Sequence, residues 1–257
     1  MKARIAFFIV AILGIGSLPA GSQQQSDAKE PLTFDVASVM PAAADELGGI
    51  VHQPPGGQRY EAIGAPLGLI MTVAYTVTGR QISRGPEWID SERWNIEAKA
   101  DRRGTSDELH AALARLLEER FQLKVRHETR NLPVYILTVD KNGLKMPVHD
   151  AADLVHEPFT GNPLGGLSGQ NVTMNSLAFF LSRLMDLNVV DRTNLSEHYD
   201  VNFHFLPEFF SVGGPTAMPD SPDIYTALRE QLGLQLQKGK GPVDYLVIEH
   251  VERPSAN

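Results

Sequence analysis

The chain has 257 residues, of which 42% are hydrophobic, a formal net charge of −8 and no cysteine. This acidic balance argues against binding to nucleic acid or to anionic membrane surfaces, both of which need clustered Lys and Arg. The lack of cysteine excludes disulfides, thiol nucleophiles and thiolate metal sites, so the fold depends on its own apolar burial. The chain holds enough apolar material for one sizeable core or two modest ones.

The first residues have the pattern of a secretory signal peptide. A short basic segment precedes the apolar stretch Ile5–Leu13, and Ala20 and Ser22 occupy the −3 and −1 positions of a small-residue cleavage site. An uncleaved anchor is the alternative, but the stretch is shorter than the roughly 20 residues that a membrane span needs. We therefore predict a signal peptide over residues 1–22, a disordered leader over 23–32, and a periplasmic or secreted protein without a stable membrane span after cleavage.

Residues 33–140 are predicted to form a first unit of strands and helices. Pro66 suits a first helical position, and Leu67 and the apolar residues that follow it share one helical face. Ser106 is the predicted cap of a second helix. The predicted elements are strands over 34–39, 59–64 and 93–100, helices from 67 and from 106, and two strands over 121–129 and 132–140 that are separated by a short polar turn.

A linker over 141–169, which ends in a glycine-rich loop containing Ser168, leads to a second unit over 170–257. Asn175 is the predicted cap of its first helix, and Gly233 is placed to end its second helix. The other predicted elements are a strand near 199–203, a helix opening at 221–223, and two closing strands over 234–237 and 241–251.

The two units contain matching phrases in the same order. "SERWNIEA" at 91–98 resembles "SEHYDVNF" at 196–203, and each places a large aromatic residue, Trp94 or Tyr199, before Asn or Asp. We predict an internal duplication in which these two aromatic residues anchor equivalent strands, because a repeated residue serves a repeated structural need more often than a reaction. The expected fold is α+β, with mainly antiparallel sheets and helices packed on one face. Periodicity leaves open whether the halves form two lobes or one sheet.

The sequence contains no recognisable catalytic or metal-binding motif. H-E-x-x-H and the nucleotide-binding fingerprints are missing, and the glycines around Ser168 do not have the G-x-S-x-G spacing. His198 and His204 could share one strand face, but no third metal ligand is evident. We predict no catalytic residue, no metal and no cofactor.

Five residues are candidates for contact with a ligand or a partner. Tyr75, Arg84 and Trp88 are predicted to form a ligand-facing patch. Phe209 and Phe210, in a loop rich in Gly and Pro, are the alternative contact point for a partner, although they could also fold back on the core.

Several segments resemble an exported family of soil bacteria, the soil-associated proteins, which is defined by a domain of unknown function. "FDVASVMP", "GRQISRGPEWIDSERWNIEAKA" and "VVDRTNLSEHYDV" carry the resemblance, which extends from Phe34 to Asn257, and Met40 stands where the family usually has Lys. The family also occurs fused to membrane metallopeptidases that resemble β-lactam sensors, and it brings no established catalytic residues. The order of elements is also similar to small periplasmic domains of secretins and TonB-dependent receptors, which implies protein docking.

The leading hypothesis is an exported, non-catalytic module that binds an envelope protein or a small ligand. Two alternatives stay open. One is a periplasmic hydrolase whose His and carboxylate groups meet only in the fold. The other is an extracytoplasmic sensor of cell-wall fragments or β-lactams, which the family's fusion partners imply.

Overall fold

The computed structural model describes residues 30–43, 49–54, 56–83, 85–150, 157–162, 166–206 and 221–254. The chain divides into Met1–Glu30 and a compact unit, Pro31–Asn257, whose fold is described here. The predicted signal peptide and most of the predicted leader lie outside the described residues. Among the helices that the structure does describe, none has both the length and the apolar character needed to cross a membrane.

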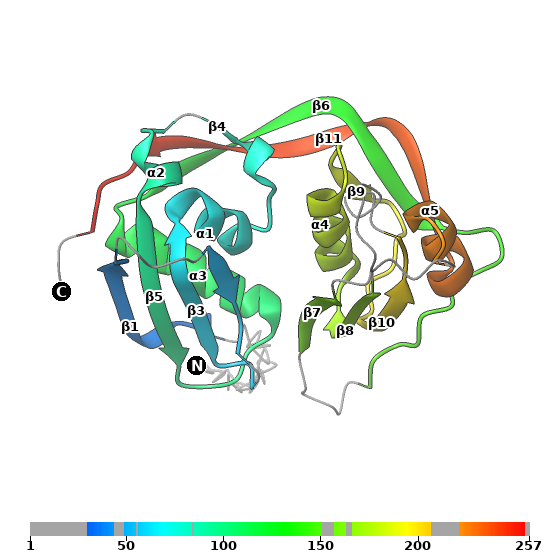
Figure 1. The fold of residues 1–257 in the computed structure, drawn as a ribbon, viewed down its shortest axis with the longest axis horizontal. Coiled ribbons are helices and arrows are strands. Elements are labelled where there is room, and N and C mark those ends of the chain that lie inside the picture. The colour runs from blue at the N-terminus through cyan, green and yellow to red at the C-terminus, as the bar shows by residue number, and fades with distance from the viewer. Residues whose placement is uncertain are drawn as a thin grey trace, which may run out of the picture. The chain divides into compact units, whose positions relative to one another are not determined.

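The fold is α+β, with mainly antiparallel sheets and helices packed alongside them (Figure 1). The first sheet has the strand order β1-β5-β3-β2, and helices α1 and α3 pack against it. Its elements are β1 (Phe34–Pro41), β2 (Ile50–His52), β3 (Arg59–Pro66), α1 (Leu67–Ala74), the short helix η1 (Gly79–Gln81), α2 (Trp88–Ser91), β5 (Arg93–Ala100) and α3 (Ser106–Arg120). The predicted strands and helices of the first unit are confirmed up to this point.

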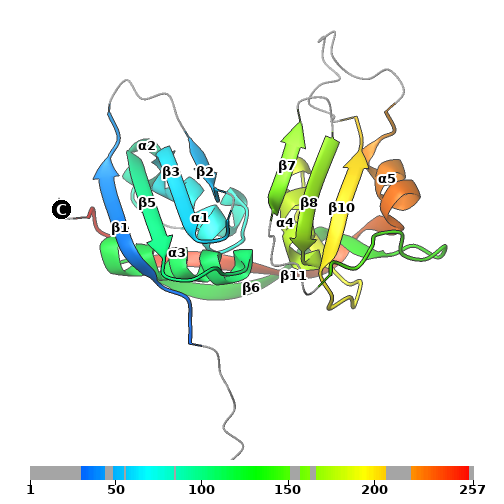
Figure 2. The same ribbon diagram turned by 90° about the horizontal axis from the view of Figure 1, so that it is seen from below.

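The second sheet has the strand order β10-β8-β7 and is seen beside the first in Figure 2. Its elements are β7 (Glu157–Asn162), β8 (Gly166–Val172), α4 (Met174–Leu184), β10 (Tyr199–His204), α5 (Ile224–Ala227) and η3 (Leu228–Leu232). The predicted loop around Ser168 is wrong, because these residues form β8 and pair with both β7 and β10. Strands β7 and β8 thus lie largely within the segment predicted as a linker.

The third sheet is built on a long antiparallel ribbon of β6 (Lys124–Val139) and β11 (Leu234–His250), which passes both other sheets (Figure 1). Two short strands run parallel to it, β4 (Ile82–Ser83) on β11 and β9 (Val189–Asp191) on β6. The prediction of two strands in place of β6, and of two in place of β11, is wrong. Pro133, Gly239 and Gly241 resemble turn residues, but they lie in the middle of the ribbon, where Pro133 faces Lys240.

Each end of the ribbon completes a different hydrophobic core. Ile248 of β11 belongs to the core formed by the first sheet with α1 and α3, whereas Tyr135 and Leu137 of β6 belong to the core formed by the second sheet with α4 and α5. Between these ends the ribbon is solvent-exposed at positions such as Lys238 and Lys240. Each core therefore uses residues from both predicted repeat units.

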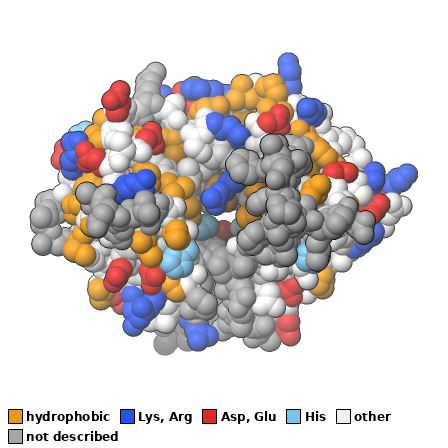
Figure 3. All heavy atoms as spheres, in the orientation of Figure 1, with side chains coloured by type: hydrophobic (Ala, Val, Ile, Leu, Met, Phe, Trp, Pro, Cys, Tyr) orange, Lys and Arg blue, Asp and Glu red, His pale blue; other side chains and the backbone are white. Residues whose placement is uncertain are grey.

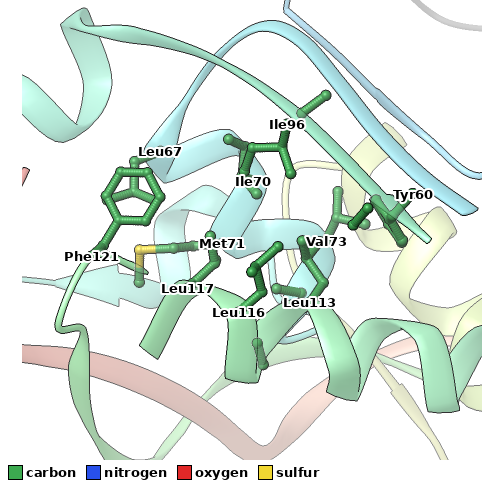
Figure 4. Packing of buried hydrophobic residues seen from close by; sticks show 14 of the residues in the cluster. Tyr60, Leu67, Ile70, Met71, Val73, Ile96, Leu113, Leu116, Leu117 and Phe121 are labelled. Atoms are coloured by element: carbon green, nitrogen blue, oxygen red, sulfur yellow. The ribbon is translucent and has the colours of Figure 1, made fainter. Parts of the chain in front are cut away.

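The first core shows why the apolar spacing forms these helices. Ile70 and Met71 of α1, together with Leu113 and Leu117 of α3, are fully buried. Figure 4 shows the α1 side chains between those of α3 and Ile96 of β5. The i, i+3, i+4 spacing of apolar residues places them on one face of each helix, and burying that face supplies most of the stability of so short a helix as α1.

Three predicted helix starts are displaced by one or two residues. Thr105, not Ser106, caps α3, and its hydroxyl accepts a hydrogen bond from Glu108 N at 3.2 Å. Thr173, not Asn175, caps α4. Pro66 is the residue before α1 and not its first helical residue. At the starts of α3 and α4 several neighbouring residues have polar side chains, so composition alone does not select the capping residue.

Gly233 ends the second helix of the second unit, as predicted. Its φ is +68°, and a Cβ at this position would lie 2.1 Å from the carbonyl oxygen of Gly143. Both the left-handed backbone and this close approach require glycine.

The two halves have the same order of elements. Strands β2, β3 and β5 pair in the order β5-β3-β2, and β7, β8 and β10 pair in the equivalent order β10-β8-β7. A helix follows the middle strand in each case, and a short parallel strand on the ribbon comes next. The predicted duplication is compatible with this correspondence and stays a prediction.

Trp94 and Tyr199 occupy equivalent positions in these two arrangements. Trp94 is 4% exposed and pairs with Ala65, two residues before α1, while Tyr199 is 2% exposed and pairs with Val172, two residues before α4. Both aromatic rings belong to the core of their own half. The matching surroundings support a structural role for both residues.

Asn95 and Asp200, which directly follow Trp94 and Tyr199, accept equivalent hydrogen bonds in the two halves. Gly64 and Asn171 have φ values of +53° and +58° at irregularities in the strand pairing. The backbone N–H of Gly64 donates to Asn95 Oδ1 at 2.7 Å, and that of Asn171 donates to Asp200 Oδ1 at 3.2 Å. The repeated phrase thus encodes an acceptor for the N–H group that each β-bulge leaves out of the ladder.

Arg80 of η1 fastens the first half to the second. Its guanidinium donates from Nε to Asn188 Oδ1 at 2.9 Å, and also to the carbonyl oxygens of Ser182 and Met185 at the end of α4. Thr78 donates to the same Asn188 oxygen at 3.0 Å. A cation suits this position because the carbonyl groups at a helix C-terminus lack intrahelical partners and carry partial negative charge.

We predict that Asn95→Ala lowers the free energy of unfolding by about 1–3 kcal/mol, because the N–H of Gly64 loses its acceptor in a partly buried position. Urea unfolding followed by circular dichroism measures the change. Asn202→Ala, on an exposed position of β10, is the matched control and is expected to change little. Equal effects of the two substitutions would contradict the role assigned to Asn95.

We predict that Arg80→Met destabilises the protein by about 1.5–3 kcal/mol, the range for hydrogen bonds to charged groups. Arg80→Lys should recover only part of the loss, since an ammonium cannot reproduce the planar fork of donors. Chemical unfolding of both variants, compared with Arg192→Met at an exposed position, provides the measurement. Full recovery by lysine would show that charge alone holds the contact.

Candidate functional site

Two of the five predicted contact residues can be placed, and they have different neighbours. Trp88 packs edge-on against Trp94, with ring centroids 6.5 Å apart, and the guanidinium of Arg253 lies 5.0 Å from its ring centroid. Arg253 in turn forms a bidentate ion pair with Glu92, with an Nε–Oε2 distance of 2.8 Å. Trp88 is therefore part of a packed cluster at the end of the chain, and its role in ligand contact stays a prediction.

Tyr75 lies elsewhere, at the end of α1, and its hydroxyl donates to Glu118 Oε1 at 3.2 Å. Burial, together with the charge of Glu118, raises the pKa of the Tyr75 hydroxyl above its ordinary value. Tyr75 and Trp88 thus have separate sets of neighbours. Arg84, Phe209 and Phe210 lie outside the described residues.

The histidines do not form a metal site in the part of the chain that the structure describes, where no group of three His, Asp or Glu side chains could hold an ion. The Nδ1 atom of His198 contacts Asn171 Oδ1 at 2.5 Å, whereas the backbone of His204 is held by the amide of Gln231. His149 is buried and contacts Asp200 Oδ1 at 2.7 Å. The contacts of His198 and His149 therefore involve Asn171 and Asp200, the two residues that are hydrogen-bonded at the second β-bulge.

A pocket of about 200 Å³, which we call the Gln53 pocket, is lined by residues from both halves. Figure 3 shows a hollow in the face of the molecule between the segments of α1 and α4, with Lys or Arg side chains beside it. The first half contributes polar groups and the second half mainly apolar ones. The lining residues are Val51, His52, Gln53, Tyr60, Val73, Ser106, His110, Phe159, Val172, Ser176, Phe179, Phe180 and Arg183.

Gln53 has a buried side-chain donor that lacks a hydrogen-bond partner among the described residues. The residue is 8% exposed, and its Oε1 atom accepts a hydrogen bond from Ser106 Oγ at 2.7 Å. Its Nε2 atom is buried and has no hydrogen-bond partner among the described residues. Two other buried polar atoms share this condition, in Ser83 and Trp94, but neither residue lines the pocket. An unpaired buried donor costs about 1–3 kcal/mol, so each instance calls for an explanation.

Two further donors face the same space. Tyr60 is 1% exposed, and its burial raises the pKa of its hydroxyl, with the positive charge of Arg183 opposing part of that rise. The hydroxyl therefore stays protonated and able to donate. Arg183, near the end of α4, is exposed and forms no hydrogen bond or ion pair with the described residues, apart from lying 5.9 Å from the ring of Phe179.

The remaining wall is apolar and aromatic. Phe159 of β7 and Phe180 of α4 stack at a tilt, with ring centroids 5.1 Å apart, and both pack against the second core. Val73 and Val172 are buried on opposite halves of the lining. An apolar wall with a few convergent polar groups is the usual composition of a small-molecule site.

Ser106 and His110 are the lining residues that a hydrolase could use. Ser106 and His110 are one helical turn apart, but the Ser106 hydroxyl donates to Gln53, and His110 Nδ1 lies 3.4 Å from Thr76 Oγ1. None of the described lining residues is Asp or Glu. Nucleophilic catalysis needs a base that contacts the nucleophile and a third group that orients the base.

Sequence reasoning missed this pocket because its residues are far apart along the chain. Gln53 follows a short strand in a Gly- and Pro-rich segment, which predicts a loop and nothing else. Arg183 ends an amphipathic helix, where a cation is expected for purely structural reasons. No pattern within either half could have brought these two residues together.

We predict that Gln53→Met lowers the free energy of unfolding by less than Gln81→Met does, because it removes one hydrogen bond, from Ser106 Oγ to Gln53 Oε1, together with a buried donor that has no partner among the described residues. Gln81 is the matched control, since its amide donates to the Asp244 carbonyl at 2.7 Å and accepts from Thr78 N at 2.8 Å. Gln81→Met should therefore lose about 1–3 kcal/mol in urea unfolding. A loss for Gln53→Met as large as that for Gln81→Met would show that the Nε2 atom of Gln53 has a partner.

Comparison with known proteins identifies the family of the chain. The family model described as Protein of unknown function (DUF3738) matches residues 68–251. No curated protein and no solved structure shows significant similarity to the chain. Because the match covers most of the chain, this protein belongs to the family described as Protein of unknown function (DUF3738).

Proposed function

We propose that this protein is an exported, non-catalytic module that binds a small ligand in the Gln53 pocket. The observation that carries the proposal is the Nε2 atom of Gln53, a buried donor that lines a cavity and has no partner among the described residues. A ligand that accepts a hydrogen bond from this atom would remove the cost of leaving it unpaired. The Oε1 atom of Gln53 has a structural partner in Ser106 Oγ, whereas its Nε2 atom has none among the described residues.

Binding is favoured over hydrolysis by the arrangement of the polar groups. Tyr60, Gln53 and Arg183 present hydrogen-bond donors, which can orient a ligand. The Ser106 hydroxyl donates to Gln53 Oε1 at 2.7 Å, which links it to the binding groups of the pocket. The hydrolase alternative would need a second arrangement that these contacts do not supply.

The sensor alternative is a special case of the same proposal. A sensor of cell-wall fragments or β-lactams must bind a small molecule before it can pass on a signal. The Gln53 pocket combines elements of both halves, so a ligand there would contact the first half and the second half together. Ligand binding is the common step, and it can be tested without a partner protein.

We predict that small molecules which bind the protein perturb the side-chain amide signals of Gln53. Screening a chemically mixed fragment library by ¹H–¹⁵N NMR, which resolves glutamine side-chain amides, provides the measurement. A ligand that accepts a hydrogen bond from Gln53 Nε2 should change the chemical shifts of this amide more than those of the Gln81 amide, which already has its partners.

Val73→Phe, which fills the pocket from α1, is expected to abolish these perturbations while the fold is retained in circular dichroism. A larger side chain in the core can destabilise the fold. Phe180→Leu therefore serves as a second variant, which widens the pocket at a partly buried position. Fragments that bind only at other surfaces, in the parent and in both variants, would overturn the proposal.

A further inference from the structure

We infer that the ligand of the Gln53 pocket is a carboxylate with a compact apolar or aromatic body. This inference rests on the proposed function, because it assigns a chemical class to the same pocket. It follows from three properties of the described lining residues, which are their charge, their excess of donors and their apolar wall.

The charge of the pocket is positive. Arg183 is the one lining residue with a permanent charge, and its guanidinium has no ion pair with the described residues. His52, at the edge of the lining, is 3.4 Å from Glu61 and so has an acidic neighbour of its own. A guanidinium presents a planar fork of donors that matches the two oxygens of a carboxylate.

The hydrogen-bonding groups also select an acceptor. Gln53 Nε2 and the protonated hydroxyl of Tyr60 are donors, whereas the Oε1 atom of Gln53 is already occupied by Ser106. A ligand amide or ammonium would bring further donors to a space where donors are in excess. A carboxylate brings acceptors only, so it can satisfy Gln53 and Arg183 without leaving a donor of its own unpaired.

The size and the wall of the pocket limit the rest of the ligand. Its volume of about 200 Å³ lies below the usual 300–1,000 Å³ of drug-sized sites, so the ligand body must be compact. The rings of Phe159, Phe179 and Phe180, with Val73 and Val172, offer an apolar surface that suits a phenyl ring or a branched alkyl group.

A single permanent cation favours a monoanion over a phosphate dianion. The first turn of α3 lies beside the pocket at Ser106, but it is not free to bind an anion, because the carboxylate of Glu108 accepts from Thr105 N at 3.0 Å. The same carboxylate forms an ion pair with Arg102, with an Nη1–Oε1 distance of 3.2 Å. The dipole of α3 is therefore already paired with an acidic residue of the chain.

The test compares three probes that share one body and differ in charge, namely phenylacetate, phenylacetamide and phenethylamine. Dissociation constants come from NMR titration of the full mature chain, read at the Gln53 side-chain amide. We expect phenylacetate to bind about tenfold or more tightly than phenylacetamide, and phenethylamine not to bind. The expected preference should weaken as salt is raised, because Arg183 is exposed.

Variants assign the preference to the residues named. Arg183→Gln should weaken phenylacetate binding about 10- to 100-fold and bring it close to that of phenylacetamide. Arg183→Lys should lie between the two, and Arg192→Gln, which removes an exposed cation outside the pocket, should leave binding unchanged. Because Arg183 is exposed and has no hydrogen bond or ion pair with the described residues, these variants are expected to keep the melting temperature of the parent.

Three outcomes distinguish the inference from the proposed function. The expected order of the probes, lost in Arg183→Gln, supports both. Binding of phenylacetamide or phenethylamine as tightly as phenylacetate overturns the carboxylate class and leaves the pocket as a binding site. If no probe binds and the mixed fragment library also leaves the Gln53 amide unperturbed, both the inference and the proposed function are wrong.

Discussion

The pairing of β6 with β11 is the interaction on which the rest of the structure depends. The two strands are antiparallel over nearly their whole length, so the start of one lies beside the end of the other. Ile248, near the end of β11, therefore packs into the first core, and Leu137, near the end of β6, packs into the second. Neither half completes its core from its own predicted unit. The contacts of Arg80 with the end of α4 act on halves that this ribbon already joins.

The repeated phrase of the sequence reflects a structural requirement that both halves share. Each half must turn from the middle strand of its sheet into a helix, and a β-bulge with a left-handed residue makes that turn. The bulge leaves one N–H without a ladder partner, and Asn95 or Asp200 accepts it, while Trp94 or Tyr199 fills the core beside it. The repeated phrase thus serves a requirement of the backbone that occurs once in each half. Asp200 in the second half also contacts buried His149.

Local patterns predicted most of the elements because each strand and helix buries one face. The apolar period identified α1, α3 and β5, and the need for a left-handed residue identified Gly233. The middle of the ribbon was misjudged for a physical reason. There exposed residues such as Lys240 and Pro242 alternate with buried ones, and Pro133 and Gly241 resemble turn residues. The pocket could not be predicted because Gln53 and Arg183, which line it together, come from different halves that the ribbon joins.

The pocket also shows where two similar halves differ. Equivalent elements line it from both sides, β2, β3 and α1 from the first half and β7, β8 and α4 from the second, but their side chains are of different kinds. The first half supplies the donors of Gln53 and Tyr60, and the second supplies the rings of Phe159 and Phe180. A shared backbone arrangement explains the shared core residues, but it does not explain this division. A polar side facing an aromatic side, with one buried amide donor that has no partner among the described residues, is the arrangement that an amphipathic ligand requires.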